Sequence, residues 1–125
     1  MPRTHEKVSY LPAGKPAGGH TPLSAAIGME CALRLLDGRW KLLILFHLFG
    51  RQVQRFSDLE RMIDGVSQKM LAQQLRQMEE DGLVIRTVHA EVPPRVEYSL
   101  TPWAEALCPA LEAMLNWIEA KPPAG

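Results

Sequence analysis

Two helices joined by a tight turn limit the fold of this 125-residue sequence more than any other feature. Apolar residues recur at helical spacing over residues 68–81, and a shorter helix is predicted over residues 58–63, where Ser57 and Glu60 have the spacing of a capping box. Three residues that include a glycine separate the two helices, and Ser67 can cap the second one. Two helices connected in this way are typical of a helix-turn-helix.

The segments on either side of this pair predict a winged helix. Helical spacing predicts two earlier helices, over residues 24–36 and 39–49, and the second is apolar on nearly every side, so we expect it inside the core. After the pair, branched residues and period-two alternation predict a hairpin over residues 84–100 with a proline-rich tip. The expected fold is mostly α with a small β-hairpin.

A last helix is predicted to start at Thr101 and Pro102, which suit a helix cap and first position, and to reach about Ala120. Pro109 should kink it, because proline removes a backbone hydrogen bond and crowds the preceding turn. Its apolar residues form more surface than one partner in so small a domain would cover. They are Trp103, Leu107, Leu111, Met114, Leu115, Trp117 and Ile118.

The length is that of one domain with short ends. Residues 1–23 are rich in proline and glycine and are expected to form a flexible arm, residues 24–120 the winged helix-turn-helix domain, and residues 121–125 a frayed C-terminus. No apolar run is long enough for a membrane span, and the N-terminus does not resemble a signal peptide. We expect a cytoplasmic protein with no membrane partner.

Charge and cysteine usage narrow the possible chemistry. Fourteen basic and fourteen acidic side chains give no net charge, so a nucleic-acid partner must be argued from local placement. Cys31 and Cys108 lie far apart, without the spacing of a disulfide framework or a zinc site. No phosphate-binding loop, catalytic motif or metal-ligand set is present, so we expect no catalytic residues, no cofactor and no metal.

The polar face of the helix over residues 68–81 carries side chains suited to reading bases. Glutamine pairs with adenine through two hydrogen bonds, arginine or lysine pairs with guanine, and a small side chain lets the backbone approach or touches a thymine methyl group. Opposite the apolar stripe lie Lys69, Gln73, Arg76 and Glu80, flanked by Ala72 and Gln77, with Gln68 in the first turn. A solvated surface helix is the alternative, since glutamine is a good helix former. Position in the second helix of the motif, which enters the major groove, favours base reading.

The hairpin offers a second contact. Arg95, with His89 and Arg86, can reach the DNA backbone or the minor groove, and two adjacent prolines limit the entropy lost when the tip becomes ordered. An inert turn is the other interpretation of this tip. The candidate DNA-binding residues are therefore Ser67, Gln68, Lys69, Ala72, Gln73, Arg76, Arg86 and Arg95.

Three blocks of the sequence resemble the HxlR-type regulators, bacterial winged-helix transcription factors distantly akin to the MarR group. They are CALRLLDGRWKLLIL (31–45), RFSDLERMIDGVSQKMLAQQLRQMEEDGLVIR (55–86) and VPPRVEYSLT (92–101). The resemblance extends over about residues 27–120. It implies a homodimer on an inverted-repeat operator of double-stranded DNA, with residues 68–81 as recognition helix, 84–100 as wing and the terminal helices as the dimer interface.

The resemblance also places Cys31 where many members of the family carry a thiol that senses oxidants, quinones or aldehydes. A helix N-terminus and a nearby arginine such as Arg34 would raise its reactivity. The other interpretation is a small buried hydrophobic residue in the first helix. For the whole chain, the alternative to a DNA-binding regulator is a winged helix that docks another protein, since a fold does not fix a function.

Overall fold

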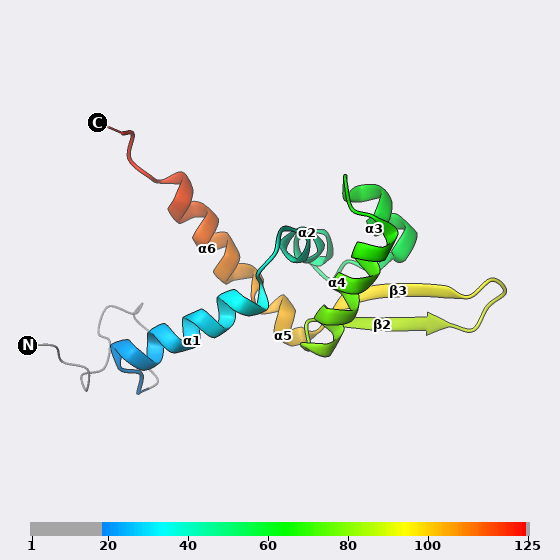
Figure 1. Ribbon diagram of the computed structural model, residues 1–125, viewed down its shortest axis with the longest axis horizontal. Coiled ribbons are helices and arrows are strands. Elements are labelled where there is room, and N and C mark those ends of the chain that lie inside the picture. Colours follow the sequence, from blue (N-terminus) through cyan, green and yellow to red (C-terminus); the bar gives the residue numbers. More distant parts are fainter. Residues whose placement is uncertain (1–18, 125) are drawn as a thin grey trace, which may run out of the picture. The chain divides into compact units, whose positions relative to one another are not determined.

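The computed structural model describes residues 19–124, and residues 1–18 of the expected arm lie outside the described residues. The chain divides into two compact units, with the boundary between Asp37 and Gly38. The first contains α1 (Pro22–Leu35). The second contains, in order, α2 (Arg39–Leu48), β1 (Gln54–Arg55), α3 (Phe56–Met62), α4 (Gln68–Glu80), β2 (Val84–His89), β3 (Arg95–Leu100), α5 (Pro102–Glu105) and α6 (Cys108–Glu119), as Figure 1 shows.

In the first unit, α1 begins at Pro22, two residues before the expected start. Thr21 is its cap, because the Thr21 side chain accepts a hydrogen bond from the Ser24 N–H at 3.2 Å. The Ser24 hydroxyl in turn accepts one from the Thr21 N–H at 2.9 Å, which completes a reciprocal capping box. Proline is favoured in the first turn of a helix, where its missing N–H has no intrahelical partner.

The core of the second unit lies where α2, α3 and α4 pack on the sheet. α2 was expected to be buried all round, and this was wrong, since Leu42, Leu43 and Phe46 are 37%, 36% and 46% exposed. The helix packs against α4 and β3, and these three side chains stay exposed because a domain this small does not enclose the helix on every side. The buried apolar residues of the unit are Ile44, Leu45, Leu48, Leu59, Ile63, Leu71, Leu75, Met78, Leu83, Val84, Tyr98, Leu100, Ala104 and Leu111.

The helix-turn-helix is confirmed as α3 and α4, with one change at the start of α3. That helix begins at Phe56, and the Asp58 carboxylate accepts a hydrogen bond from the Arg55 N–H at 3.3 Å. The expected Ser57 and Glu60 capping box was therefore wrong. Gly65 has a φ of 84° in the turn, a conformation that glycine adopts without strain.

The predicted hairpin is present, and β1 adds a third strand to it. The antiparallel order is β1-β3-β2, with Val84 opposite Leu100, Arg86 opposite Tyr98 and His89 opposite Arg95. Because side chains alternate across a strand, the face that holds Val84, Tyr98 and Leu100 packs on the helices. Figure 1 shows β2 and β3 extending past α4 to a loop at their tip.

The last helix is broken where a kink was expected. The Thr101 hydroxyl accepts a hydrogen bond from the Ala104 N–H at 3.1 Å and caps α5, which ends at Glu105. α6 then starts at Cys108 with Pro109 in its first turn, a position where proline costs no hydrogen bond. No helix within residues 19–124 combines the length and apolar character needed to cross a membrane.

Candidate nucleic-acid interface

The apolar stripe of α4 fixes which side of the helix faces outward. Leu71, Leu75 and Met78 are at most 1% exposed, as the helical wheel predicts. The opposite side is therefore turned to solvent. Of the expected contact residues on this helix, Ala72 is half-buried, and the exposed ones are Gln68, Lys69, Gln73 and Arg76.

The polar side chains of α4 differ in whether they are already hydrogen-bonded. The Gln77 amide donates to the Asp81 carboxylate at 3.3 Å, one helical turn ahead. In contrast, the side chains of Gln68, Lys69, Gln73 and Arg76 form no hydrogen bond or ion pair with any part of residues 19–124. Their donors and acceptors are therefore available to a ligand.

Ser67 stands at the entrance to α4. Its hydroxyl oxygen accepts a hydrogen bond from the Met70 N–H at 3.0 Å, which satisfies one of the unpaired N–H groups of the first turn. The hydroxyl proton can still be donated outward. A helix N-terminus also favours negative charge, so this end of α4 suits an anion.

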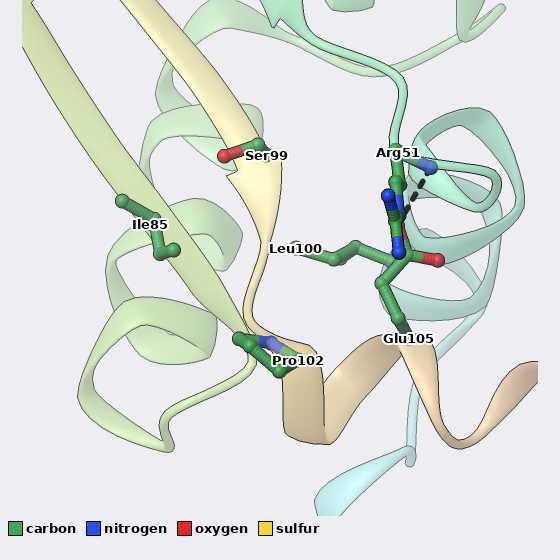
Figure 2. Close-up of a pocket in the computed structure, with 6 residues that line it drawn as sticks. All are labelled: Arg51, Ile85, Ser99, Leu100, Pro102 and Glu105. Carbon is green, nitrogen blue, oxygen red and sulfur yellow. Dashed lines mark hydrogen bonds between the residues drawn. The ribbon is translucent and has the colours of Figure 1, made fainter.

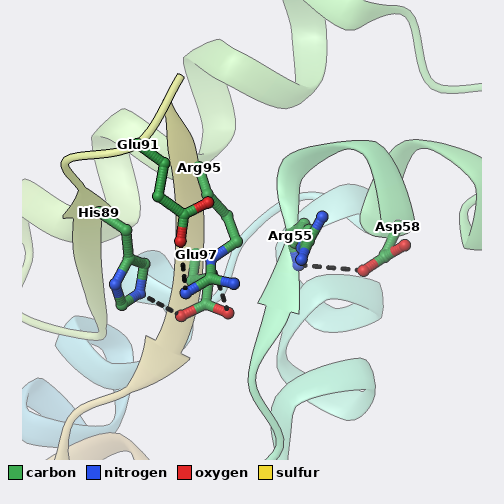
Figure 3. Close-up of polar contacts among 6 residues, drawn as sticks. All are labelled: Arg55, Asp58, His89, Glu91, Arg95 and Glu97. Carbon is green, nitrogen blue, oxygen red and sulfur yellow. Dashed lines mark hydrogen bonds and ion pairs between the residues drawn. The ribbon is translucent and has the colours of Figure 1, made fainter. Parts of the chain in front are cut away.

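Arg95 of the hairpin is held by carboxylates on the sheet face turned away from the helices (Figure 3). One guanidinium nitrogen lies 3.2 Å from Glu91, and its Nε lies 3.8 Å from Glu97 without a hydrogen-bond partner. Nε2 of His89 lies 2.5 Å from the other Glu97 oxygen. A DNA phosphate would have to compete with two carboxylates for Arg95.

Arg86 lies on the opposite face of the same hairpin. It is exposed, and with Arg76, Ala72, Glu79 and Tyr98 it lines a groove of about 370 Å³ between α4 and the sheet. The structure thus brings Arg76 and Arg86 together and places Arg95 apart from them. Sequence reasoning missed Tyr98 and Glu79, because Tyr98 lies in the alternating pattern of core residues and Glu79 in an acidic run.

A second hollow, of about 530 Å³, lies at the base of the hairpin (Figure 2). Its walls include Ile85, Ser99 and Pro102, and Arg51 lies beside Glu105 at its edge. The Glu105 carboxylate accepts hydrogen bonds from the backbone N–H groups of Gly50 and Arg51, at 3.1 and 2.7 Å. Both carboxylate oxygens are therefore engaged in holding the turn after α2.

The surroundings of the two cysteines differ, and those of Cys31 are not the ones expected from the sequence. Cys31 is exposed in the C-terminal half of α1, so the expectation of a nearby helix N-terminus, like that of burial, was wrong. Burial raises the pKa of the half-buried Cys108 thiol, and the hydrogen bond and charge of Glu112 raise it further. No group of three or more metal-ligating side chains occurs within the part of the chain that the structure describes.

Known proteins are similar to this chain in architecture and in sequence. The profile of the HxlR-like helix-turn-helix family matches residues 35–124. The HTH-type transcriptional regulator YtfH of Escherichia coli K12 is 47% identical over 91 residues, which are 73% of this chain and 71% of the relative. The redox regulator HypR in its reduced form superimposes with a TM-score of 0.68 at 38% identity, over 74% of this chain and 91% of that one. Reduced YodB of Bacillus subtilis gives a TM-score of 0.70 at 36% identity, over 78% of this chain and 95% of YodB.

Proposed function

The chain belongs to the HxlR-like helix-turn-helix family of transcriptional regulators, and from this premise we propose that it binds a specific double-stranded DNA site as a homodimer. α4 enters the major groove, and the β2–β3 hairpin follows the backbone beside it. This is the arrangement in which the second helix of the motif reads bases. The proposed site of action is the cytoplasm of a bacterial cell.

The observation that carries this proposal is the outward face of α4. Its side chains are exposed and unpaired, whereas Gln77 at the end of the helix is already bonded to Asp81. The proposed contacts from α4 and its cap are Ser67, Gln68, Lys69, Ala72, Gln73 and Arg76, and those from the hairpin are Arg86 and Arg95. Amide and guanidinium groups recognise bases by paired hydrogen bonds, and a hydroxyl at a helix N-terminus suits a phosphate.

The homodimer is supported by apolar surface that the second unit leaves uncovered. Four large residues of α6, Met114, Leu115, Trp117 and Ile118, are between 46% and 73% exposed. Patches of this kind mark association surfaces, because monomeric proteins seldom expose them. A two-fold dimer would set its two α4 helices about 34–36 Å apart, which fits an inverted-repeat operator. Sedimentation equilibrium of the wild type and of Trp117→Glu tests the dimer, and equal masses would contradict it.

The DNA site can be found by selection from a pool of random duplexes. Fluorescence anisotropy then compares the selected duplex with a shuffled duplex of the same composition at several salt concentrations. We expect tighter binding to the selected duplex, and a slope of log affinity against log salt that steepens by about 0.9 for each neutralised phosphate. Equal affinity for both duplexes would contradict sequence-specific binding and favour a protein-docking role.

Two glutamines of the same helix provide a matched pair of variants for this titration. Gln73→Ala should reduce the preference for the selected duplex by about 5- to 150-fold, the value of one paired base contact of ~1–3 kcal/mol. Gln77→Ala should change it little, because Gln77 is bonded to Asp81. Equal losses in the two variants would contradict the assigned orientation of α4.

A response to oxidants through Cys31 is a second proposed property. It is supported by the exposure of the thiol and by similarity to HypR and YodB, of which HypR is described as a redox regulator and YodB has been studied after diamide treatment. Diamide treatment should change the DNA affinity of the wild type and of Cys108→Ser, but not that of Cys31→Ser. An unchanged affinity of the wild type after complete oxidation would remove Cys31 from the regulation.

A further inference from the structure

We propose that Arg76 of α4 and Arg86 of β2 together hold one backbone phosphate of the bound duplex, in the groove that Tyr98 lines. The inference rests on the proposed DNA-binding function and adds to it a defined subsite for a phosphodiester oxygen. It also assigns Arg76 a backbone contact, whereas the helical wheel alone predicts that this arginine reads a base.

The position of Arg86 in the sheet is the first argument. Arg86 is directly opposite Tyr98, and side chains of a strand alternate between faces, so it points to the same face as buried Val84. A charged group on the helix-packed face of a sheet is costly unless it reaches water or a partner. Arg86 is exposed and emerges into the groove beside α4.

Arg76 reaches the same groove from the helix. Residues spaced by three or four share one side of a helix, and the α4 residues that line the groove, Ala72, Arg76 and Glu79, have this spacing. Arg76 follows the buried Leu75 by one position, so the core contact of α4 fixes the direction of its side chain. Two arginines from different elements therefore line the same groove of about 370 Å³.

Neither guanidinium has a partner to neutralise it. The side chains of Arg76 and Arg86 form no ion pair or hydrogen bond with residues 19–124, even though Glu79 lines the same groove. Arg95, on the other face of the hairpin, is paired with both Glu91 and Glu97. Two positive charges at one groove repel each other, and an anion bound between them offsets the repulsion. Guanidinium groups bind phosphate oxygens in pairs with defined geometry, which makes a phosphate the fitting anion.

Tyr98 adds a third donor. The residue is only 7% exposed and its ring lies near that of Phe56, at a centroid distance of 6.5 Å, so it is fixed in place. Its hydroxyl makes no hydrogen bond within residues 19–124, yet it is not among the buried atoms that lack a partner. The hydroxyl is therefore open to solvent and can donate to a phosphate oxygen.

The location of the groove agrees with a backbone contact. It lies between the helix that is proposed to enter the major groove and the hairpin beside it. One sugar-phosphate strand borders the major groove at this side, and contacts to it set the register of a protein on the duplex without reading sequence. A phosphate held here would fix the depth and the angle at which α4 enters the major groove.

The test replaces one phosphate at a time with an uncharged methylphosphonate in the selected duplex. For the wild type, we expect one linkage in each half-site where the replacement lowers affinity by about tenfold or more, the value of charge-assisted hydrogen bonds. Arg76→Ala and Arg86→Ala should each bind more weakly, and each should lose most of the effect at that same linkage. Arg95→Ala, on the other face of the same hairpin, removes a different proposed contact, so its overall affinity should fall while it keeps the full effect at that linkage. Thermal unfolding and circular dichroism show that each variant is folded.

The outcomes separate this proposal from the function on which it rests. If the wild type prefers the selected duplex but the two arginine variants lose sensitivity at different linkages, the shared phosphate is wrong and DNA binding stands. If Arg76→Ala retains the full effect at the linkage and selects a different base, Arg76 reads a base and the proposal is overturned. If the wild type does not prefer the selected duplex at all, the proposed function fails, and this subsite fails with it.

Discussion

The backbone N–H of Arg51 donates a 2.7 Å hydrogen bond to the carboxylate of Glu105, across 54 positions of sequence. The other carboxylate oxygen accepts the Gly50 N–H at 3.1 Å. Figure 2 shows the Arg51 and Glu105 pair. A side chain of α5 thus accepts hydrogen bonds from the two backbone N–H groups of the turn that ends α2. The start of the C-terminal helical segment is thereby fastened to the central helix of the DNA-binding unit.

Glu105→Ala should lower the free energy of unfolding by about 1–3 kcal/mol, because it leaves the two turn N–H groups without their charged acceptor. Urea denaturation measures the change. Glu119→Ala, at the exposed end of α6, is the control and should alter stability by less than about 0.5 kcal/mol. Equal effects of the two substitutions would contradict the role assigned to Glu105.

Arg51→Gly should raise the free energy of unfolding by about 0.5–1 kcal/mol. Arg51 has a φ of 61°, a left-handed conformation that costs a residue with a Cβ atom ~1–2 kcal/mol, and glycine recovers this at a smaller entropic cost. Arg51→Ala removes the same side-chain atoms but keeps Cβ, so it should not stabilise. A gain in Arg51→Ala as large as that in Arg51→Gly would show that the charge, and not the backbone, was responsible.

Thr101→Val should destabilise the protein by about 1–2 kcal/mol, in the range of a lost helix cap. The hydroxyl accepts from the Ala104 N–H at 3.1 Å and donates to the Gly82 carbonyl at 2.7 Å, so it joins the start of α5 to the end of α4. Thr101→Ser keeps both bonds and should remain within about 0.5 kcal/mol of the wild type. Thermal unfolding distinguishes these results, and a Thr101→Ser protein as unstable as Thr101→Val would contradict them.

Cys108 should react slowly with N-ethylmaleimide. Burial raises its pKa, and the Glu112 hydrogen bond and charge add to this, so less thiolate is present at a given pH. Since the folded thiol loses its proton at a higher pH than the unfolded one, its rate should continue to rise above pH 9. Glu112→Gln should accelerate the reaction, and peptide mass spectrometry follows it. An equal rate in Glu112→Gln and wild type would contradict the assigned cause.

The helix-turn-helix was predictable because its signals are local. The spacing of Leu71, Leu75 and Met78 and the cap at Ser67 lie within one short segment, and the structure confirms each of them. The start of α3 was not predictable in this way. Arg55 and Ser57 are both possible caps within one turn of each other. The helix includes Phe56 because its ring packs near Tyr98 of β3, which is distant in sequence.

The details of the interface depend on strand register, which the sequence pattern leaves open. Arg95 and Glu97 share the outer face of the hairpin because they lie two positions apart on β3, and the pairing of Thr87 with Glu97 brings His89 of β2 to the same face. The same register carries Arg86 to the other face and beside Arg76. Two arginines that look equivalent in the sequence therefore have different surroundings. The exposed side of α2 was likewise unpredictable, since its residues are as apolar as those it buries.

Dimethyl sulfate footprinting of the selected duplex tests the central claim most directly, because the reagent methylates guanine N7 in the major groove. Two copies of α4 in successive grooves should protect two patches of guanines, centred about 10–10.5 base pairs apart and related by two-fold symmetry. Gln73→Ala should weaken the protection of both patches, when wild type and variant are compared at protein concentrations that leave the duplex only partly bound. Protection of a single patch, or tight and selective binding with no guanine N7 protected, would contradict the account.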